Sequence, residues 1–403
     1  MRKAFCLLLT ALLACSAFPA FAEAPDDSLA ALAEPYGFKV GGVISYAGLR
    51  DAAYLALLKR DFNSITPGNE LKAYSLLDQF ACQRSADGMP AMRYDQADAL
   101  LQFAKDNGIA VRGHVLVWDA YMPDYFFREG YQNSTPFVSA DVMKTRLQSY
   151  IKQVVTHFET SFPGVIYCWD VVNEAIADSA AEWSSADERH IRTSRSGVDN
   201  LFFQVLGADY IALSFLYAKD TLERCGSSVK LFYNDYNAFY PQKRDSIIAL
   251  VESINSFATD AQGNARKLCD GVGMQGYIGG YGTQDGRLNE ADLDRIETAM
   301  QAYAALGLEV QVTEMAVRAY VNDDATMQKH AAFYAELFRR FVSVNSGEAK
   351  PLTAVTIWGL VDCPSLPREH YSYKLNSPYG GLFAEDYAEK SALTSVRDAL
   401  RQR

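Results

Sequence analysis

The chain has 403 residues with a formal net charge of −11 at pH 7, and 49% of its residues are hydrophobic. This length and composition suit one large α/β barrel or two smaller soluble domains. The acidic balance, with no basic stripe along the chain, argues against nucleic acid as a partner.

The first 22 residues have the pattern of a secretory signal peptide. Two basic residues precede the apolar run 5–13, which is too short to span a bilayer stably, and residues 20–22 form a small-x-small cleavage site. We therefore expect a secreted protein whose mature domain covers residues 23–403. A lipoprotein signal ending at Cys15 is the alternative, but its Leu13 is atypical. No later stretch reaches transmembrane length.

Five cysteines follow the signal segment, and none of them falls in a CxxC or Cys/His pattern. The sequence thus predicts neither a disulfide scaffold nor a zinc site, although one bridge is possible. We expect no metal and no cofactor, and we expect Cys168 to be a buried thiol. The five are Cys82, Cys168, Cys225, Cys269 and Cys363.

Apolar strand-like runs alternate with longer amphipathic segments along the mature chain. Eight such units predict a parallel sheet with crossovers and favour a closed (β/α)8 TIM barrel, an α/β fold with a single catalytic domain, over an open sheet. A GxGxxG motif after the first strand is missing, which weakens the dinucleotide-binding alternative. The predicted strands are 40–45, 64–66, 110–117, 165–172, 230–234, 271–275, 309–313 and 354–358, and the predicted helices are 52–62, 96–107, 141–158, 210–225, 245–257, 290–306 and 325–344.

Two of the predicted strands end in a glutamate. The run 168–172 leads into Asn173 and Glu174, and the run 309–313 leads into Glu314. A carboxylate at the end of a buried strand is costly unless it faces an open site, although a single such residue could also be a solvated loop glutamate. In a barrel all strand carboxyl ends share one face, so these two side chains would meet there. Paired carboxylates are typical of glycoside hydrolysis.

These motifs, taken in order, resemble glycoside hydrolase family ten, the endo-β-1,4-xylanase family, whose fold is this barrel. The resemblance runs from about residue 40 to residue 400. Residues 169–175 match the family's acid/base strand almost letter for letter, and residues 312–315 are similar to its nucleophile strand. Further segments resemble its second, third, fifth, sixth and eighth strands, namely 62–72, 112–118, 233–237, 271–275 and 358–359.

The resemblance implies a retaining endo-β-1,4-xylanase that cleaves the xylan backbone by double displacement. Glu314 would be the nucleophile and Glu174 the acid/base, with carboxyl groups about 5–5.5 Å apart. A general acid must keep its proton near neutral pH, so we expect Glu174 to lie in a drier and more negative environment than Glu314. The expected partner is a polysaccharide, and the expected state is a monomer without a separate carbohydrate-binding module.

Further residues carry over from the family as candidate sugar contacts. Asn69 and Lys72 resemble contacts to the sugar one unit beyond the cleavage point. Each candidate also has a structural interpretation: the histidine could be a core residue, the tryptophans could be packing, and the lysine could be solvated. The contacts to the cleaved sugar would come from His114, Trp118, Asn173 and Gln275, with Trp358 as an aromatic wall beneath it.

The chain departs from the family pattern in the same region. Tyr277 stands where the family has the histidine that donates to the nucleophile, and Ala316 replaces the aspartate that holds this histidine. A tyrosine hydroxyl can donate as well, so we predict a Tyr277–Glu314 hydrogen bond; the alternative is that Tyr277 points away and the site is crippled. The other departures are Gly68 for a glutamate, Asp119-Ala120-Tyr121 for His-Ser-Gln, and the loss of a second tryptophan near Leu366.

These departures leave two alternatives to a plain xylanase. One is a barrel glycosidase acting on another β-linked glycan, or on decorated xylan only. The other is a catalytically weak carbohydrate-binding protein. The presence of both Glu174 and Glu314 argues against the second alternative.

Overall fold

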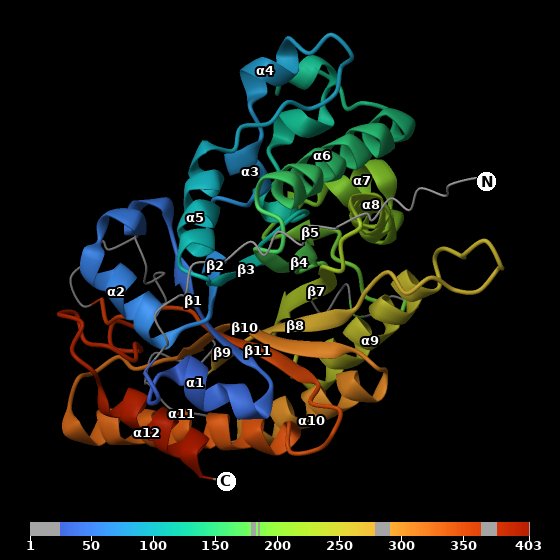
Figure 1. The fold of residues 1–403 in the computed structure, drawn as a ribbon. Helices are drawn as coiled ribbons and strands as arrows, with labels where there is room; N and C mark the ends of the chain where they lie inside the picture. Colours follow the sequence, from blue (N-terminus) through green and yellow to red (C-terminus); the bar gives the residue numbers. More distant parts are fainter. Residues whose placement is uncertain (1–24, 179–182, 184–185, 279–290, 364–376, 403) are drawn as a thin grey trace, which may run out of the picture.

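The computed structural model describes residues 25–178, 183, 186–278, 291–363 and 377–402. The predicted signal segment 1–22 and the departure at Leu366 lie outside these residues. Within them, eight parallel strands form a closed ring (Figure 1). Consecutive strands of the ring pair with each other, and β11 pairs with both β1 and β10. The predicted (β/α)8 barrel is confirmed. Its strands are β1 (Lys39–Ile44), β2 (Ser64–Pro67), β3 (Ala110–Gly113), β4 (Ile166–Asn173), β7 (Lys230–Tyr236), β8 (Gly271–Gln275), β10 (Glu309–Val317) and β11 (Leu352–Ile357).

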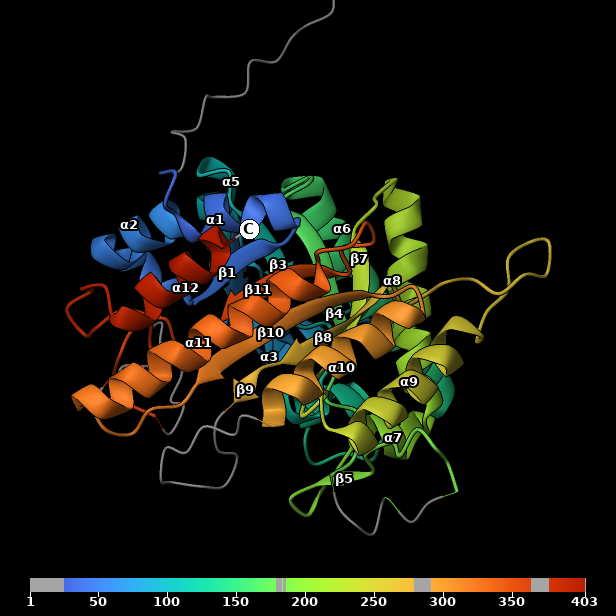
Figure 2. The ribbon, with the colours of Figure 1, turned by 90° about the horizontal axis from the view of Figure 1, so that it is seen from below.

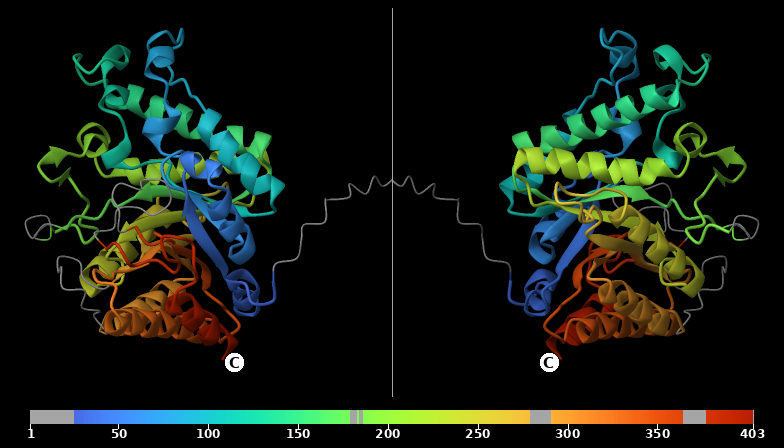
Figure 3. Two further views of the ribbon diagram at one scale, coloured as in Figure 1. Left: turned by 90° about the vertical axis from the view of Figure 1, so that its left-hand side faces the viewer. Right: turned by 90° about the vertical axis from the view of Figure 1, so that its right-hand side faces the viewer.

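All seven predicted helices are present around the barrel. Figure 3 shows α5, α6 and α8 on one side of the strands and α10, α11 and α12 on the other. Figure 2 shows α11 and α12 lying side by side, and the two pack against each other. The long helices are α2 (Ala52–Asp61), α5 (Asp95–Asp106), α6 (Ala140–Ser161), α8 (Asp209–Cys225), α9 (Pro241–Asn255), α10 (Ala291–Ala305), α11 (Asp324–Val344) and α12 (Ser391–Arg401).

Short elements connect the strands to the helices, and the sequence pattern did not predict them. They include a two-stranded hairpin between β4 and α8 and a short strand directly after β8. The short elements are α1 (Leu29–Ala33), α3 (Ala73–Leu76), α4 (Gln79–Gln83), α7 (Leu201–Leu206), β5 (Ser194–Arg195), β6 (Val198–Asp199), β9 (Tyr277–Ile278), η1 (Glu34–Tyr36), η2 (Tyr46–Arg50), η3 (Asp119–Tyr121), η4 (Asp124–Phe127) and η5 (Glu129–Tyr131).

Two strands, β3 and β10, end four residues away from the predicted end, and both ends lie next to the candidate site. The predicted strand 110–117 stops at Gly113, and only Val117 beyond it forms a bridge, with Val172. The predicted strand 309–313 continues to Val317 because its last residues pair with β9. Glu314 therefore lies within β10, whereas Glu174 directly follows β4.

The interior of the barrel beneath the strand carboxyl ends is polar. Arg112 on β3 forms a buried ion pair with Asp170 on β4 and donates from Nε to Gln311 Oε1 on β10 at 2.7 Å. Because β3 and β10 are not neighbours in the ring, these side chains meet inside the barrel. Trp169 packs over Gly113, where a Cβ atom would lie 2.3 Å from the indole. Only glycine therefore fits under this ring.

Two further features of the described residues concern disulfide bonds and membrane-spanning helices. All five cysteines within the described residues are free thiols, and Cys168 is buried as predicted. Within the same residues, no helix combines the length and the apolar character that a membrane crossing needs.

Candidate active site

The two predicted catalytic glutamates lie at the same end of the barrel and belong to one hydrogen-bonded network. Glu174 and Glu314 are buried, with exposed fractions of 7% and 6%. Gln275 Nε2 donates to Glu174 Oε1 at 3.0 Å and to Asn173 Oδ1 at 3.3 Å. Asn234 Nδ2 donates to the same Asn173 oxygen at 2.9 Å and to Glu314 Oε1 at 3.3 Å. The carboxamides of three different strands thus connect the two carboxylates.

The backbone of Glu174 is fixed from two sides. Its φ of 54° places it in the left-handed region, where non-glycine residues are uncommon. Its N–H donates to the carbonyl of Asn234 at 2.8 Å, and its own carbonyl accepts from Arg192 Nε at 3.0 Å. These bonds hold Glu174 in this conformation directly after β4.

The predicted hydrogen bond from Tyr277 to Glu314 is present: the phenol hydroxyl donates to Oε2. Strand β9 brings it there, because Tyr277 and Ala316 are direct partners in the β9–β10 pairing. The two residues that replace the family's histidine and aspartate are therefore neighbours in space. The role of this bond in catalysis stays a prediction.

Burial and a neighbouring negative charge affect Glu314. Burial raises the pKa of Glu314 to about 7, with the Tyr277 hydrogen bond acting against the rise and the negative charge of Glu174 adding to it. Two carboxylates that share one buried site cannot both ionise easily, which is why the charge of Glu174 adds to the rise.

The expected difference between the two environments is wrong. Burial also raises the pKa of Glu174, but Arg195 opposes the rise, and its Nη1 lies 2.8 Å from Glu174 Oε2. The acid/base candidate therefore has a cation in contact with it and does not lie in the more negative surroundings. Arg195 also pairs with Asp119, with its Nη2 3.2 Å from Asp119 Oδ1.

Sequence reasoning missed Arg195. It lies on β5, in a hairpin with no apolar periodicity and no match to the motifs. The departure at Asp119 was the one available signal, since an aspartate introduced beside a carboxylate pair needs a cation nearby.

Lys72 is a buried residue and not a solvated helix lysine. Its side chain donates to Asn69 Oδ1 at 3.0 Å, and burial lowers the pKa of Lys72 to about 8 against the pull of Glu314 and Glu174. Its ammonium lies 5.1 Å from the ring centroid of Trp118 and 4.5 Å from that of Tyr121. Lys72 thus connects Asn69, a predicted contact to the outer sugar, with the rings of Trp118 and Tyr121.

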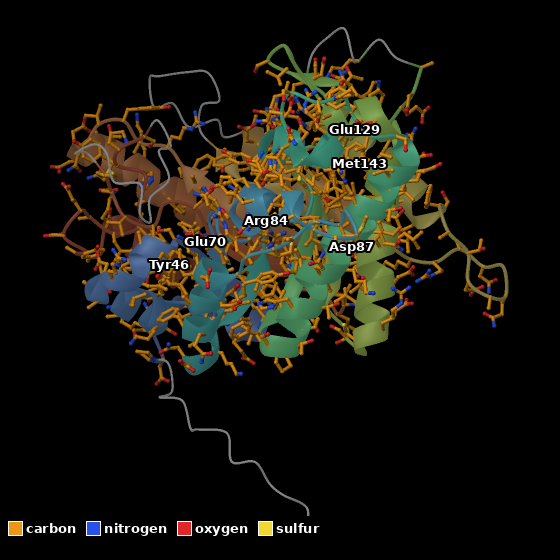
Figure 4. All side chains as sticks on the ribbon, turned by 90° about the horizontal axis from the view of Figure 1, so that it is seen from above. Tyr46, Glu70, Arg84, Asp87, Glu129 and Met143 are labelled. Atoms are coloured by element: carbon orange, nitrogen blue, oxygen red, sulfur yellow. The ribbon has the colours of Figure 1, made fainter. Side chains whose placement is uncertain are left out.

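The neighbouring Glu70 has a structural role beside Lys72. Its carboxylate accepts from the backbone N–H of Tyr46 at 2.6 Å and from that of Asn69 at 3.1 Å. Figure 4 labels Glu70 and Tyr46 side by side, away from Glu129 and Met143 on the η5 and α6 side of the molecule. Glu70 therefore fixes the loop that carries Asn69, next to the position where Gly68 replaces a glutamate.

His114 connects the barrel interior to the aromatic residues of the site. Its Nδ1 lies 2.8 Å from Asp170 Oδ2, and burial lowers the pKa of His114 to about 4 despite that partner. The neutral ring donates from Nδ1 to the carboxylate, which leaves Nε2 as an acceptor. The ring lies edge-on to Trp118 and Trp358, with centroids 5.9 and 6.3 Å away.

Two donors within the described part of the site are buried without a hydrogen-bond partner: Trp118 Nε1 and Asn173 Nδ2. Buried donors are rarely left unsatisfied in proteins, and these two atoms have almost no exposed surface. The ten sequence-predicted site residues thus fall into two connected groups. Hydrogen bonds join one group, and ammonium and ring contacts join the other, while the charges of Glu174 and Glu314 act on Lys72 across the two groups. The first group is Glu174, Asn173, Gln275, Glu314 and Tyr277, and the second is Asn69, Lys72, His114, Trp118 and Trp358. Within the described residues no cluster of His, Cys, Asp or Glu could hold a metal ion.

The chain is similar to known proteins in sequence and in structure. The sequence model described as Glycosyl hydrolase family 10 matches residues 28–399. Endo-1,4-beta-xylanase B of Butyrivibrio fibrisolvens is 33% identical over 332 residues, which are 82% of this chain but only 47% of that protein. The chain thus spans about half the length of this relative.

Solved structures are similar over almost the whole chain. The endo-1,4-beta-D-xylanase 10B of Clostridium thermocellum, as CBM22-1 and GH10 modules with xylohexaose, has a TM-score of 0.77 and 29% identity, covering 93% of this chain and 68% of that one. An intracellular xylanase of Thermoanaerobacterium saccharolyticum has a TM-score of 0.70 and 28% identity, covering 92% of this chain and 98% of that one.

Proposed function

Because this chain belongs to glycosyl hydrolase family 10, we propose that it is a secreted, retaining endo-β-1,4-xylanase. The observation that carries the proposal is the buried pair of Glu174 and Glu314 at one end of the barrel. One carboxylate accepts a hydrogen bond from Gln275 and the other from Asn234, and both of these amides also donate to Asn173. The relatives described above bear the name xylanase. Secretion rests on the pattern of residues 1–22 alone, with anchoring through Cys15 as the alternative.

In the proposed first step, a carboxylate oxygen of Glu314 forms a bond to the anomeric carbon while the glycosidic C–O bond breaks. Glu174 gives its proton to the leaving oxygen. In the second step, Glu174 removes a proton from water, and the water oxygen displaces Glu314 from the anomeric carbon. Tyr277 and Asn234 donate to Glu314 and would stabilise it as the carboxylate before attack and after release. The carboxyl separation of about 5–5.5 Å expected of this mechanism stays a prediction.

The test is a substrate panel with the purified chain 23–403. We expect reducing sugars and short oligomers from plain xylan, and the β-anomer as the first product seen by NMR. Glucuronoxylan, arabinoxylan and mixed-linkage glucan are run beside it, because Gly68 and Tyr121 change the outer contacts. Cleavage of the glucan without any xylan would contradict the xylanase, and an initial α-anomer would contradict the retaining mechanism.

The hydrogen bond from Tyr277 gives a specific prediction. Replacing Tyr277 with phenylalanine should lower kcat/KM on xylan about 10- to 100-fold, since hydrogen bonds to charged groups contribute about 1.5–3 kcal/mol. The bond lowers the pKa of Glu314, so its loss raises that pKa. The nucleophile must be ionised, and therefore the acidic limb of the kcat/KM profile should move to higher pH.

Tyr303→Phe is the matched control for this variant. Its buried hydroxyl, on α10, donates to the carbonyl of Ala238 at 2.8 Å and to neither Glu174 nor Glu314. Removing that hydroxyl should lower thermal stability without moving the acidic limb. An active Tyr277→Phe enzyme with an unchanged profile would show that the bond does not support Glu314.

A further inference from the structure

We propose that Arg195, held in place by Asp119, is a positioning residue that favours the ionised form of Glu174 and so assists the second half of the reaction. This inference rests on the proposed function, because it needs Glu174 to alternate between acid and base. It concerns a residue outside the motifs that identify the family.

The hairpin that carries Arg195 is fixed to the same turn as Glu174. Strands β5 and β6 pair antiparallel, and the two residues between them, Ser196 and Gly197, have φ values of 50° and 80°. Positive φ at both positions is typical of a tight hairpin turn. At the base of the hairpin, Asn200 Nδ2 donates to the carbonyl of Arg192 at 3.0 Å, and Arg192 in turn donates to the carbonyl of Glu174.

Arg195 contacts two carboxylates at once. Its Nη1 lies 2.8 Å from Glu174 Oε2, while Nη2 and Nε lie 3.2 and 3.4 Å from the two oxygens of Asp119. Nη2 also donates to the carbonyl of Glu174 at 3.3 Å. The side chain of Arg195 is 24% exposed, and the side chains of Glu174 and Asp119 are 9% and 5% exposed, so water screens these contacts only in part. Ionised hydrogen-bonded pairs of this kind are about twice as strong as neutral ones.

Other charged groups face Glu174 from several elements. Asp235 on β7 and Glu314 on β10 disfavour its ionisation, while Lys243 on α9 and Lys72 after β2 favour it. The ammonium of Lys243 is shared between Asp178 at 2.9 Å and Asp235 at 3.1 Å. Arg195 differs from these groups because it touches the Glu174 carboxylate directly.

Asp119 explains how one arginine can serve both halves of the reaction. When Glu174 carries its proton as the acid, it no longer neutralises Arg195, and an unpaired cation in a partly buried site is costly. Asp119 remains as the partner in that state. Once the proton has left, Arg195 can bind both carboxylates and hold Glu174 ready to act as the base. Asp119 therefore limits how far Arg195 opposes protonation.

Opposite changes in the pH profile test this arrangement. Arg195→Gln removes the cation, which should raise the pKa of Glu174 and move the alkaline limb of kcat/KM up by about one pH unit. Asp119→Asn removes a negative charge and leaves Arg195 to Glu174 alone, which should lower that pKa and move the limb down. The substrate is phenyl β-xylobioside, whose poor leaving group needs the proton of Glu174, and 13C NMR titration of labelled glutamate carboxyls, assigned with Glu174→Gln, gives the same pKa without substrate.

Arg189→Gln is the matched control, since Arg189 is a surface arginine paired with Asp187 in the segment before the hairpin. It should leave both the limb and the NMR titration unchanged. The proposal is overturned if Arg195→Gln titrates like the wild type, or if both variants shift in the same direction. The NMR titration decides this even if no xylan is cleaved, an outcome that would overturn the proposed function alone.

Discussion

Replacing Glu314 with alanine should lower kcat on xylan by about 10⁴-fold or more, as removal of a covalent nucleophile does in other enzymes. The glycosyl-enzyme forms on this carboxylate, and no other carboxylate accepts from both Tyr277 and Asn234 within the described residues. Reducing-sugar release from xylan measures the loss. Binding of xylo-oligosaccharides, followed by calorimetry, should be retained because the other contacts stay in place.

Two controls separate lost chemistry from lost folding. Glu309→Ala removes a half-buried glutamate from the same strand, at the opposite end of β10, where it pairs with Lys230 at 3.6 Å. It should keep full activity. Sodium azide added to Glu314→Ala should restore turnover of an activated aryl glycoside and give the α-azide, since azide then attacks from the side that Glu314 occupied. A Glu314→Ala protein that cleaves xylan at the wild-type rate would contradict the assignment of Glu314 as the nucleophile.

The barrel could be predicted from the sequence because its signal is repeated. Eight apolar runs alternate with helical segments, and the observed strands follow in the predicted order. The start of α9 was predicted less accurately, since no polar N-cap marks it. This helix begins at Pro241, four residues before the predicted start, because proline suits the first turn of a helix.

The ends of the strands depend on partners that no local pattern reveals. Strand β10 runs past Glu314 because Ala316 and Val317 find partners in β9, a pairing between segments far apart in sequence. Likewise, the predicted strand 110–117 stops at Gly113, and the irregular segment after it places His114 next to Asp170. Such ends are set by tertiary contacts and not by propensity.

Which residues form the site could be predicted from the sequence, but the charged groups in contact with each carboxylate could not. The motifs place Glu174 and Glu314 on strands whose ends must meet, so topology alone brings them together. Which of the two has a cation in contact depends on a hairpin outside the motifs, and Arg195 reverses the expected difference in surroundings. The Tyr277 hydrogen bond could be predicted because two linked replacements pointed to it, whereas Arg195 had a single replaced partner, Asp119, as its signal.

Replacing Glu174 with alanine should affect substrates according to their leaving group. Xylan has a poor leaving group that needs a proton, so its hydrolysis should fall about 10²- to 10⁴-fold, the usual contribution of a general acid. A 2,4-dinitrophenyl β-xylobioside needs no such proton, so its first step should be nearly unchanged. The second step loses its base, and a glycosyl-enzyme on Glu314 should therefore accumulate and be visible by mass spectrometry as a burst product.

The protein should remain folded in this variant, because Arg195 keeps Asp119 as a partner when the Glu174 carboxylate is removed. The alkaline limb of the pH profile should disappear, since the group whose ionisation ends activity is gone. Azide should accelerate the second step and give the β-azide, the configuration opposite to that expected for Glu314→Ala. Equal losses on xylan and on the dinitrophenyl substrate would contradict an acid/base role, because a residue that only binds the sugar affects both substrates alike.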